Sequence, residues 1–403
     1  MLILYMKKMR LKRSFMYFSG IIAEYNPLHK GHAHHIALTK QNTKSEYTVI
    51  VMSGNFTQRG EPAIFDKWAR TRMALSAGAD MVLELPVSYA LGSAERFAHG
   101  AVKIMDSIGI SSLCFGSETA NLQKLSLVAE LLAEEPEQYR TALRKELNKG
   151  ISFPAAREAA VSSLLGENAG VLSSPNDILG IEYIKAIKRL KSCIRPVPVL
   201  REGSGYNDAS MSELPSALAI RTALRRGDKT AYSALPISSQ IWCAQPVFPE
   251  DMTQLLLYAL RTRTPQQLAK IYGVSEGMEF KLARECKKCR SYDELLSALK
   301  SKRYTLTKIK RMLACVLLNI TDELTTEIDS EGLYARVLGI RKTAKPLLSH
   351  ISKTSSIPVV TQPNSKALSA SLALDIRASD VYSLFGGISR AARDFTEGLI
   401  ISD

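Results

Sequence analysis

The first 120 or so residues alternate short apolar stretches, which have the length of buried strands, with longer stretches whose apolar residues repeat at helical spacing. This rhythm is typical of a parallel sheet whose strands are joined by right-handed helical crossovers. The fold class is therefore predicted as α/β. The strands are expected at residues 17–23, 47–53, 81–85 and 112–115, and the helices between them at residues 32–40, 67–77 and 93–108.

The later chain departs from this alternation in two places. Residues 121–165 contain leucines at helical spacing and are expected to form helices inserted into the α/β plan. A helix starting at Ser174 and Pro175 and a strand at residues 196–200 then follow, and beyond Pro236 the pattern predicts mostly helices. We therefore expect a possible leader or start-site artefact at residues 1–15, an α/β domain at 16–230 and a helical domain at 231–403.

The charge and the cysteines limit the class of protein. Lys and Arg exceed Asp and Glu by 53 to 39, a net charge of +14, which favours a polyanionic partner such as nucleic acid or an anionic membrane. No apolar run reaches the roughly 18 residues of a membrane-spanning helix, and the basic cluster at residues 7–13 follows the apolar start instead of preceding it, unlike a signal peptide. Six scattered cysteines suit a reducing cytoplasm, and the pair Cys286 and Cys289 has no second pair to complete a zinc site.

The motif with the clearest chemistry is H-x-G-H, at His29 to His32, directly after the first predicted strand and at the start of a helix. A helix N-terminus has unpaired backbone N–H groups and a partial positive charge, so phosphate oxygens bind there. Gly31 lets a phosphate approach the backbone, and the imidazoles add donors. Two alternatives remain: a surface helix that begins with several histidines, and a metal site. Because only Glu24 accompanies the histidines as a possible further ligand, no metal site is predicted.

Two further stretches carry cations that could hold a phosphate or a carboxylate. Arg59 lies in the polar loop SGNFTQRGEPAIFD, and Lys67 and Arg70 follow on the next helix. Ser216 and Arg221 stand at the start of a later helix, after Pro215. The alternative in both cases is an ordinary solvated loop and helix.

Six segments, taken in their order along the chain, resemble the bacterial tRNA(Met) cytidine acetate ligase family. They are GIIAEYNPLHKGH, SGNFTQRGEPA, FDKWARTRMALSAGADMVLELP, FGSE, SPNDILGIEY and SALAIR. That family belongs to the H-x-G-H nucleotidyltransferase superfamily. The resemblance implies a Rossmann-like catalytic domain with a helical C-terminal domain. It also implies a ligase that activates acetate with ATP as acetyl-adenylate and acetylates the exocyclic amine of the wobble cytidine in elongator tRNA(Met), giving N4-acetylcytidine.

The resemblance also implies site residues. His29 and His32 match the superfamily's motif histidines and are expected to act in catalysis. SALAIR lacks the Ser-Thr pair of the superfamily's second motif. ATP-binding positions are implied at Ile22, Ala23, Glu24, Tyr25, Asn26, Pro27, Leu28, Lys30, Gly31, Ala33, His34, His35, Gly116, Asn176 and Arg201.

The expected chemistry needs positioning and charge stabilisation more than a covalent nucleophile, because acetate attacks the α-phosphorus in line with departing pyrophosphate. Mg²⁺ is expected to accompany ATP through phosphate oxygens and water. Glu24 is a candidate base for the transfer to cytidine. The alternatives are an adenylyltransferase of coenzyme biosynthesis and an RNA-binding protein without catalysis.

The densest basic stretch outside the first residues lies at residues 281–311, with eleven Lys and Arg against three acidic residues. A solvated helix face is the alternative reading, but the tRNA-modifying resemblance favours an RNA surface. The candidate tRNA-binding residues are Arg303, Lys308, Lys310 and Arg311, and the expected partner is the anticodon loop of elongator tRNA(Met).

Overall fold

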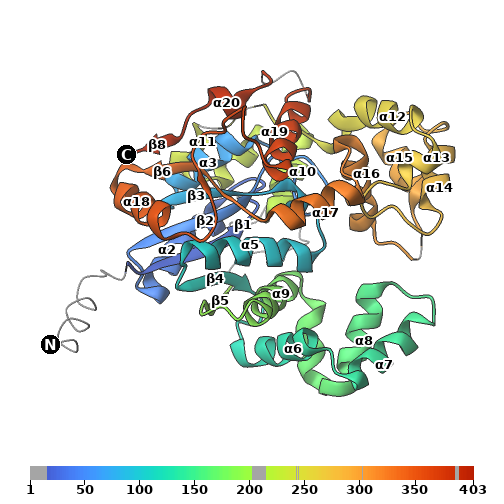
Figure 1. Ribbon diagram of the computed structural model, residues 1–403, viewed down its shortest axis with the longest axis horizontal. Coiled ribbons are helices and arrows are strands. Elements are labelled where there is room, and N and C mark those ends of the chain that lie inside the picture. Colours follow the sequence, from blue (N-terminus) through green and yellow to red (C-terminus); the bar gives the residue numbers. More distant parts are fainter. Residues whose placement is uncertain (1–15, 202–214, 242, 244, 302, 386–389) are drawn as a thin grey trace.

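A computed structural model describes residues 16–201, 215–241, 243, 245–301, 303–385 and 390–403. The predicted leader, residues 1–15, therefore lies outside the described residues. At the centre of the molecule lies one sheet with the strand order β5-β4-β1-β2-β3-β6-β7, in which β8 also pairs with β6 (Figure 1). Its strands are β1 (Phe18–Ala23), β2 (Tyr47–Ser53), β3 (Met81–Leu85), β4 (Ser112–Ser117), β5 (Arg195–Leu200), β6 (Ala335–Arg341), β7 (Val359–Val360) and β8 (Ile400–Ser402).

The five strands of the first half are parallel, as the alternation predicts. Every residue of β2 and β3 is buried, because helices cover both faces of the sheet. Val49 and Val51 pack into one core and Ile50 and Met52 into the other, as the two-residue period of a strand requires. The helices of this half are α2 (Lys30–Thr43), α3 (Lys67–Ser76), α4 (Val87–Ala90), α5 (Ala94–Ile108), α9 (Pro175–Arg189) and α10 (Ala217–Arg225).

The two faces have different helices. α5 and α9 contribute to the first core, while α2, α3 and α10 contribute to the second. Local signals fix where these helices begin and end. Ser93 caps α5 by accepting from the Arg96 N–H, and Gly109 ends it in the left-handed conformation at φ +86°. The side chain of Asp66 caps α3 in the same way. Because β1, β2, β3 and β4 run in the same direction, the loops that follow them lie at the same, carboxyl edge of the sheet.

The inserted helices are found where the leucine spacing predicts them. They form a lobe below the sheet in Figure 1 and comprise α6 (Leu122–Glu134), α7 (Glu137–Leu147) and α8 (Phe153–Leu165), followed by the 3₁₀ segment η1 (Gly166–Ser173). A second lobe lies to the right of the sheet in the same view. It contains α12 (Thr253–Arg261), α13 (Pro265–Leu268), α14 (Met278–Glu285), α15 (Tyr292–Leu299) and α16 (Leu306–Leu318).

The end of the chain returns to the sheet, so the segment predicted as mostly helical also contains strands. β6 pairs antiparallel with β3 and extends the sheet, and β7 and β8 both pair with β6. The sequence predicts mostly helices after residue 236, and these three strands were missed. The remaining elements are α11 (Ile237–Gln240), α17 (Asp322–Glu331), α18 (Lys345–Thr354), α19 (Ala370–Tyr382), α20 (Arg393–Thr396) and the 3₁₀ segments η2 (Lys229–Ala234), η3 (Pro249–Met252) and η4 (Lys342–Ala344). Within the described residues, no helix combines the length and apolar character that a membrane crossing requires.

Candidate active site

A cavity of about 410 Å³ lies at the carboxyl ends of β1, β4 and β5, where parallel sheets place their ligands. It brings together most of the predicted site residues. Those that line it are Ile22, Ala23, Glu24, Tyr25, Asn26, His29, Gly31, His32, His34, His35, Arg59, Gly116, Asn176, Arg201, Ser216 and Arg221. Pro27, Leu28, Lys30 and Ala33 belong to the same loop and helix but do not line the cavity.

The H-x-G-H motif forms the start of α2. His29 is the residue before the helix, and its backbone N–H donates to Nδ1 of His32 at 3.3 Å. The two imidazole rings stack with their centroids 3.7 Å apart, and the ring of Tyr25 meets His32 edge-on. A Cβ on Gly31 would lie 3.1 Å from the His29 ring, so glycine is needed for this close packing. The result is a rigid imidazole pair beside the unpaired N–H groups of a helix N-terminus.

Three histidines of this site, His29, His32 and His35, are neutral at pH 7 because burial lowers the pKa of each. Burial, with smaller contributions from Arg201 and Arg221, lowers the pKa of His29 to about 3. Burial lowers the pKa of His35 to about 4 and holds the pKa of His32 well below its ordinary value. Positive charge in the cavity therefore comes from arginines and from the helix N-terminus. The imidazoles can supply hydrogen bonds without adding charge.

Asn26 connects three parts of the cavity wall. Its side-chain oxygen accepts from the backbone N–H of Ile64 at 2.7 Å, and its carbonyl oxygen accepts from the Arg221 guanidinium. Ser216 caps α10 by accepting from the Ala219 N–H, and α10 carries Arg221. The start of α10 is thereby fixed against the H-x-G-H loop, which brings Arg221 to the cavity as predicted.

The orientation of Asn176 is set by Glu118, a residue to which the sequence analysis gave no role. Glu118 Oε1 accepts from the Asn176 side-chain amide at 2.6 Å and from the Asn176 backbone N–H at 3.3 Å. Glu118 Oε2 accepts from the Asp177 N–H at 3.0 Å and so caps α9. Because a carboxylate is only an acceptor, it fixes the Asn176 NH₂ toward itself and leaves Oδ1 to face a donor on a ligand.

The loop between β2 and α3 closes another side of the cavity. Glu24 accepts from the backbone N–H of Gln58, and burial raises the pKa of the Glu24 carboxyl. Gly60, at φ +78°, packs directly against the backbone of α16, and Lys310 on that helix pairs with Glu61. The loop that carries Arg59 is thus held between the first predicted strand and the C-terminal lobe.

Lys67 and Arg70 do not line the cavity, which corrects their expected role as phosphate or substrate contacts. Both are completely buried. Lys67 Nζ contacts Glu84 and Asp394, each at 2.8 Å. The Arg70 guanidinium donates to four backbone carbonyls, those of Glu24, Ser53, Gly54 and Phe65. Both cations stabilise the fold beneath the site.

Comparison with known proteins agrees with this geometry. Residues 16–395 match the family model described as HIGH Nucleotidyl Transferase. The chain is 39% identical to the tRNA(Met) cytidine acetate ligase of Acetivibrio thermocellus over an alignment of 411 residues, with 95% of this chain and 99% of that protein covered. It is 42% identical to the protein of the same name from Thermoanaerobacter sp. strain X514 over 398 residues, with 94% and 98% covered. The chain belongs to the tRNA(Met) cytidine acetate ligase family.

Solved structures extend the likeness to this cytidine acetate ligase family in three dimensions. The crystal structure of apo Thermotoga maritima TmcAL (form I) is 34% identical and matches with a TM-score of 0.91 over 96% of this chain and 100% of that one. The structure of Thermotoga maritima TmcAL bound with alpha-thio ATP matches with a TM-score of 0.88 at the same identity and coverage. The family resemblance and the predicted fold class are thereby confirmed.

Other parts of the site could not be read from motifs in this family member. The cavity has an apolar wall that comes from four elements: Phe97 on α5, Phe115 on β4, Leu179 and Tyr183 on α9, and Leu200 on β5. Such residues look like core positions in sequence, since strand ends and helix faces are apolar throughout the domain. For Phe115 and Leu200 the available signal was their position at the carboxyl ends of predicted strands, and no such signal marked the three residues on helices.

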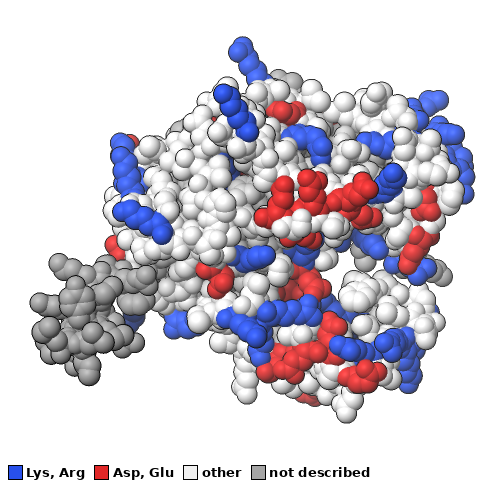
Figure 2. Space-filling view, in the orientation of Figure 1, with Lys and Arg blue, Asp and Glu red and all other residues white. Residues whose placement is uncertain are grey.

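The candidate tRNA-binding residues lie on and before α16 and do not line the cavity. Arg303 pairs with Glu276, and the Lys308 ammonium lies 4.3 Å from the Tyr304 ring centroid. Lys310 pairs with Glu61, while Arg311 donates to the carbonyl of Gln58 at 3.5 Å. Figure 2 shows blue basic side chains at the edge of the lobe formed by α12–α16 and red acidic ones over α17. Their role in RNA binding stays a prediction.

Proposed function

We propose that the protein is an ATP-dependent ligase that activates acetate as acetyl-adenylate and transfers the acetyl group to the wobble cytidine of elongator tRNA(Met). The observation that carries this proposal is the stacked, neutral pair His29 and His32 at the N-terminus of α2, facing a cavity with arginines on its other sides. The names of the full-length relatives and the alpha-thio ATP complex of a 34% identical structure support it.

The cavity offers separate surroundings for the parts of ATP. Phosphate oxygens would accept from the N–H groups at the start of α2 and from the two imidazoles, with Arg201, Arg221 and Arg59 adding positive charge. The adenosine would lie against the apolar wall, where Asn176 Oδ1 can accept from an adenine amine or a ribose hydroxyl. In this arrangement the α-phosphate would lie between the histidines and the nucleoside.

In the first step an acetate oxygen attacks the α-phosphorus, a P–O bond forms, and the bond to the leaving pyrophosphate breaks. The protein contributes alignment and electrostatic stabilisation of the phosphate charge. We expect Mg²⁺ to arrive with ATP on its phosphate oxygens. Within the described residues, no group of three or more His, Cys, Asp or Glu side chains is arranged to hold a metal ion.

In the second step the cytidine N4 amine attacks the acyl carbon, AMP departs, and the nitrogen loses a proton. Glu24 is the proposed acceptor of that proton, because it lines the cavity and burial raises the pKa of its carboxyl above the ordinary value. The wobble base is already unpaired in an anticodon loop, so its presentation costs less than flipping a base from a duplex.

The tRNA would also contact the basic stretch on α14–α16, with Arg303, Lys308, Lys310 and Arg311 as candidates. The contact of α16 with the Arg59 loop supports this placement, because it puts the basic lobe next to the cavity. All six cysteines are unpaired, which suits the reducing cytoplasm in which we expect this reaction.

Incubation with labelled acetate, ATP and tRNA tests the proposal. Label in tRNA cytidine, together with AMP and pyrophosphate, is the expected result. A failure to form AMP in response to acetate would refute the ligase assignment. Transfer of AMP to a phosphate-containing acceptor would instead indicate an adenylyltransferase, and tRNA binding without turnover would indicate a non-catalytic RNA-binding protein.

A further inference from the structure

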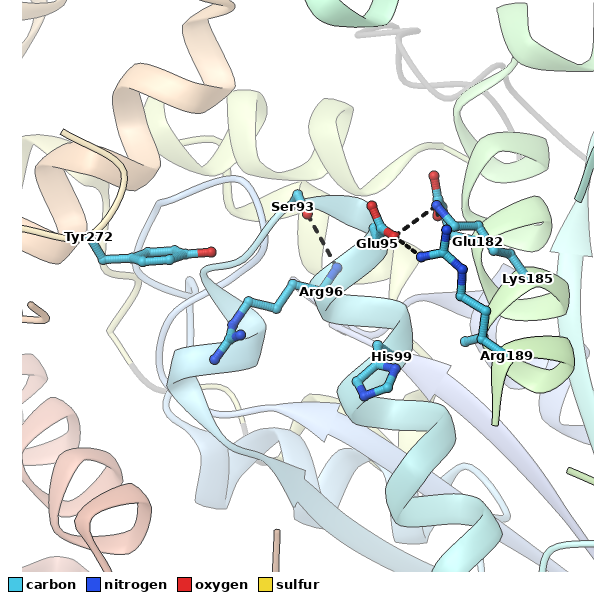
Figure 3. Close-up of a pocket in the computed structure, with 9 residues that line it drawn as sticks. Ser93, Glu95, Arg96, His99, Glu182, Lys185, Arg189 and Tyr272 are labelled. Carbon is cyan, nitrogen blue, oxygen red and sulfur yellow. Dashed lines mark hydrogen bonds and ion pairs between the residues drawn. The ribbon is translucent and has the colours of Figure 1, made fainter. Parts of the chain in front are cut away.

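A second cavity, of about 310 Å³, lies on the outer side of α5 and α9 (Figure 3). Its walls come from the first turns of α5, from α9 and from Tyr272, which follows α13 in the C-terminal lobe. Figure 3 shows the Tyr272 ring pointing into the space, with Arg96 and His99 below it and Lys185 and Arg189 opposite. The cavity therefore lies between the α/β domain and the C-terminal lobe.

The charges that face this cavity are paired with one another. Lys185 contacts both Glu95 and Glu182, and Arg189 contacts Glu95 as well. Burial lowers the pKa of the partly exposed His99, which is therefore mainly neutral at pH 7. Since the cations already have carboxylate partners, the cavity is poorly suited to bind a phosphate. It offers a mixture of donors and acceptors instead.

Tyr272 and Arg96 add two flat surfaces. The Arg96 guanidinium is fixed by two hydrogen bonds to Asp329 and one to the carbonyl of Ser88. It lies 4.5 Å from the Tyr89 ring centroid and 5.7 Å from that of Tyr272. Aromatic rings and guanidinium planes are the surfaces on which unpaired RNA bases stack. Here both are held in place before any ligand arrives.

The second cavity adjoins the candidate active site. Phe97 on α5 lines the first cavity, while its neighbour Arg96 lines the second. The same division occurs on α9 between Tyr183 and Glu182. Gln58, which lines the first cavity, also donates to the carbonyl of Gly92, directly before α5. Adjacent residues of two helices thus separate the two spaces.

We propose that the second cavity binds the base and ribose of an unpaired nucleotide next to the target cytidine, with its base stacked on Tyr272. The inference rests on the proposed function, because it needs the target cytidine in the first cavity. A volume of 310 Å³ is at the lower end of the roughly 300–1,000 Å³ typical of small-molecule sites, which suits one nucleoside. The paired charges favour an uncharged heterocycle with donors and acceptors over a phosphate group.

The test compares tRNA binding by Tyr272→Leu, Tyr272→Phe and wild-type protein over a series of salt concentrations. Tyr272→Leu keeps apolar volume but loses stacking, so we expect its Kd for elongator tRNA(Met) to rise about tenfold. Tyr272→Phe keeps the ring and should bind nearly as the wild type does. The salt dependence should be the same for all three proteins, since no phosphate contact is lost.

Tyr258→Leu is the matched control, because Tyr258 is 70% exposed on α12 and outside the second cavity. Its tRNA affinity should not change. An unchanged Kd for Tyr272→Leu overturns the inference, and so does an equal loss in Tyr258→Leu or a shallower salt dependence. ATP affinity and melting temperature of each variant identify a general folding defect. If Tyr272→Leu has such a defect, Tyr272→Met takes its place: weaker tRNA binding than Tyr272→Phe supports the inference, and equal binding overturns it. If wild-type protein acetylates tRNA while Tyr272→Leu binds normally, the inference alone fails.

Discussion

Replacing Glu118 with Gln should weaken ATP binding, although Glu118 does not line the cavity. The wild-type carboxylate accepts from both N–H groups at the start of α9 and from the Asn176 amide. Glutamine keeps only one acceptor oxygen, and where that oxygen takes the place of Oε2 and accepts from the Asp177 N–H, its NH₂ group faces the NH₂ group of Asn176. The Asn176 amide is then expected to turn over and present a donor to the nucleoside, where the wild type presents Oδ1.

The magnitude follows from the contacts. One hydrogen bond to the nucleotide is lost, which costs about 1 kcal/mol and raises the ATP Kd about fivefold. The helix cap is weakened as well, with a loss of about 1 kcal/mol in the free energy of unfolding. Titration calorimetry with ATP measures the first effect, and urea unfolding measures the second. Glu130→Gln, which removes a charge from an exposed residue of the adjacent α6, should leave ATP binding unchanged.

A double-mutant cycle with Asn176→Ala decides whether Glu118 acts through Asn176. In the Asn176→Ala background, Glu118→Gln should no longer change the ATP Kd, because the amide that it reorients is absent. Its effect on unfolding should persist in part, since the bond to the Asp177 N–H is still affected. If Glu118→Gln weakened ATP binding equally in both backgrounds, the proposed positioning role would be refuted.

Four further predictions concern the two motif histidines and the paired lysines Lys67 and Lys310. His32→Ala should abolish acetate-dependent AMP formation while leaving the Kd for tRNA nearly unchanged, and equal loss of both would contradict the proposed division of roles. Because burial lowers the pKa of His29 to about 3 from an unfolded value near 6.5, the unfolded state binds the additional proton below pH 6.5. The free energy of unfolding should therefore fall as the pH is lowered from 6.5 to about 3, and the His29 part of this fall is absent above pH 6.5. His29→Asn should flatten this part of the plot of unfolding free energy, measured with urea, against pH. Lys67→Met should lower the free energy of unfolding by about 3–5 kcal/mol, since it removes the cation paired with the buried Glu84 carboxylate and leaves Asp394 only the more distant Arg336; a stable variant with weaker ATP binding would restore the phosphate role. Lys310→Ala should raise the KM for ATP by releasing the Arg59 loop, whereas an effect on tRNA binding alone would show that the ion pair with Glu61 is unimportant.

The sequence pattern was sufficient to predict the strands and helices in the first half of the chain, because each is signalled by residues that are close together in the sequence. Strands buried on both faces are continuous apolar runs, and β2 and β3 have the predicted bounds of residues 47–53 and 81–85. The H-x-G-H motif was found for a similar reason: a strand, a turn and a helix start follow one another in the chain. Its neutral histidines could not be predicted, because their low pKa values depend on burial by other elements.

The strands at the end of the chain required information that no local window contains. β6 has the sequence ARVLGIR, which also suits a short helix, and its partner β3 lies about 250 residues earlier. Strand preference depends on what a neighbouring strand offers, so the pairing decides the conformation. The buried Lys67 shows the same dependence, because one of its two carboxylate partners, Asp394, lies at the other end of the sequence.

In the basic stretch at residues 281–311, the number of Lys and Arg residues predicts an RNA-binding surface. It does not show what each cation does. Lys310 is held by Glu61, and Gly60 leaves no space for a side chain between the loop and the backbone of α16. A lysine in such a contact gives up part of its attraction for phosphate and instead fixes the Arg59 loop. In the proposed reaction the stretch around α16 (Leu306–Leu318) therefore has two roles: its cations, of which Arg303 before the helix is exposed, would attract tRNA, and its contact with the loop would position a wall of the ATP cavity. A cation on this helix can consequently affect either substrate, and only its partners show which one.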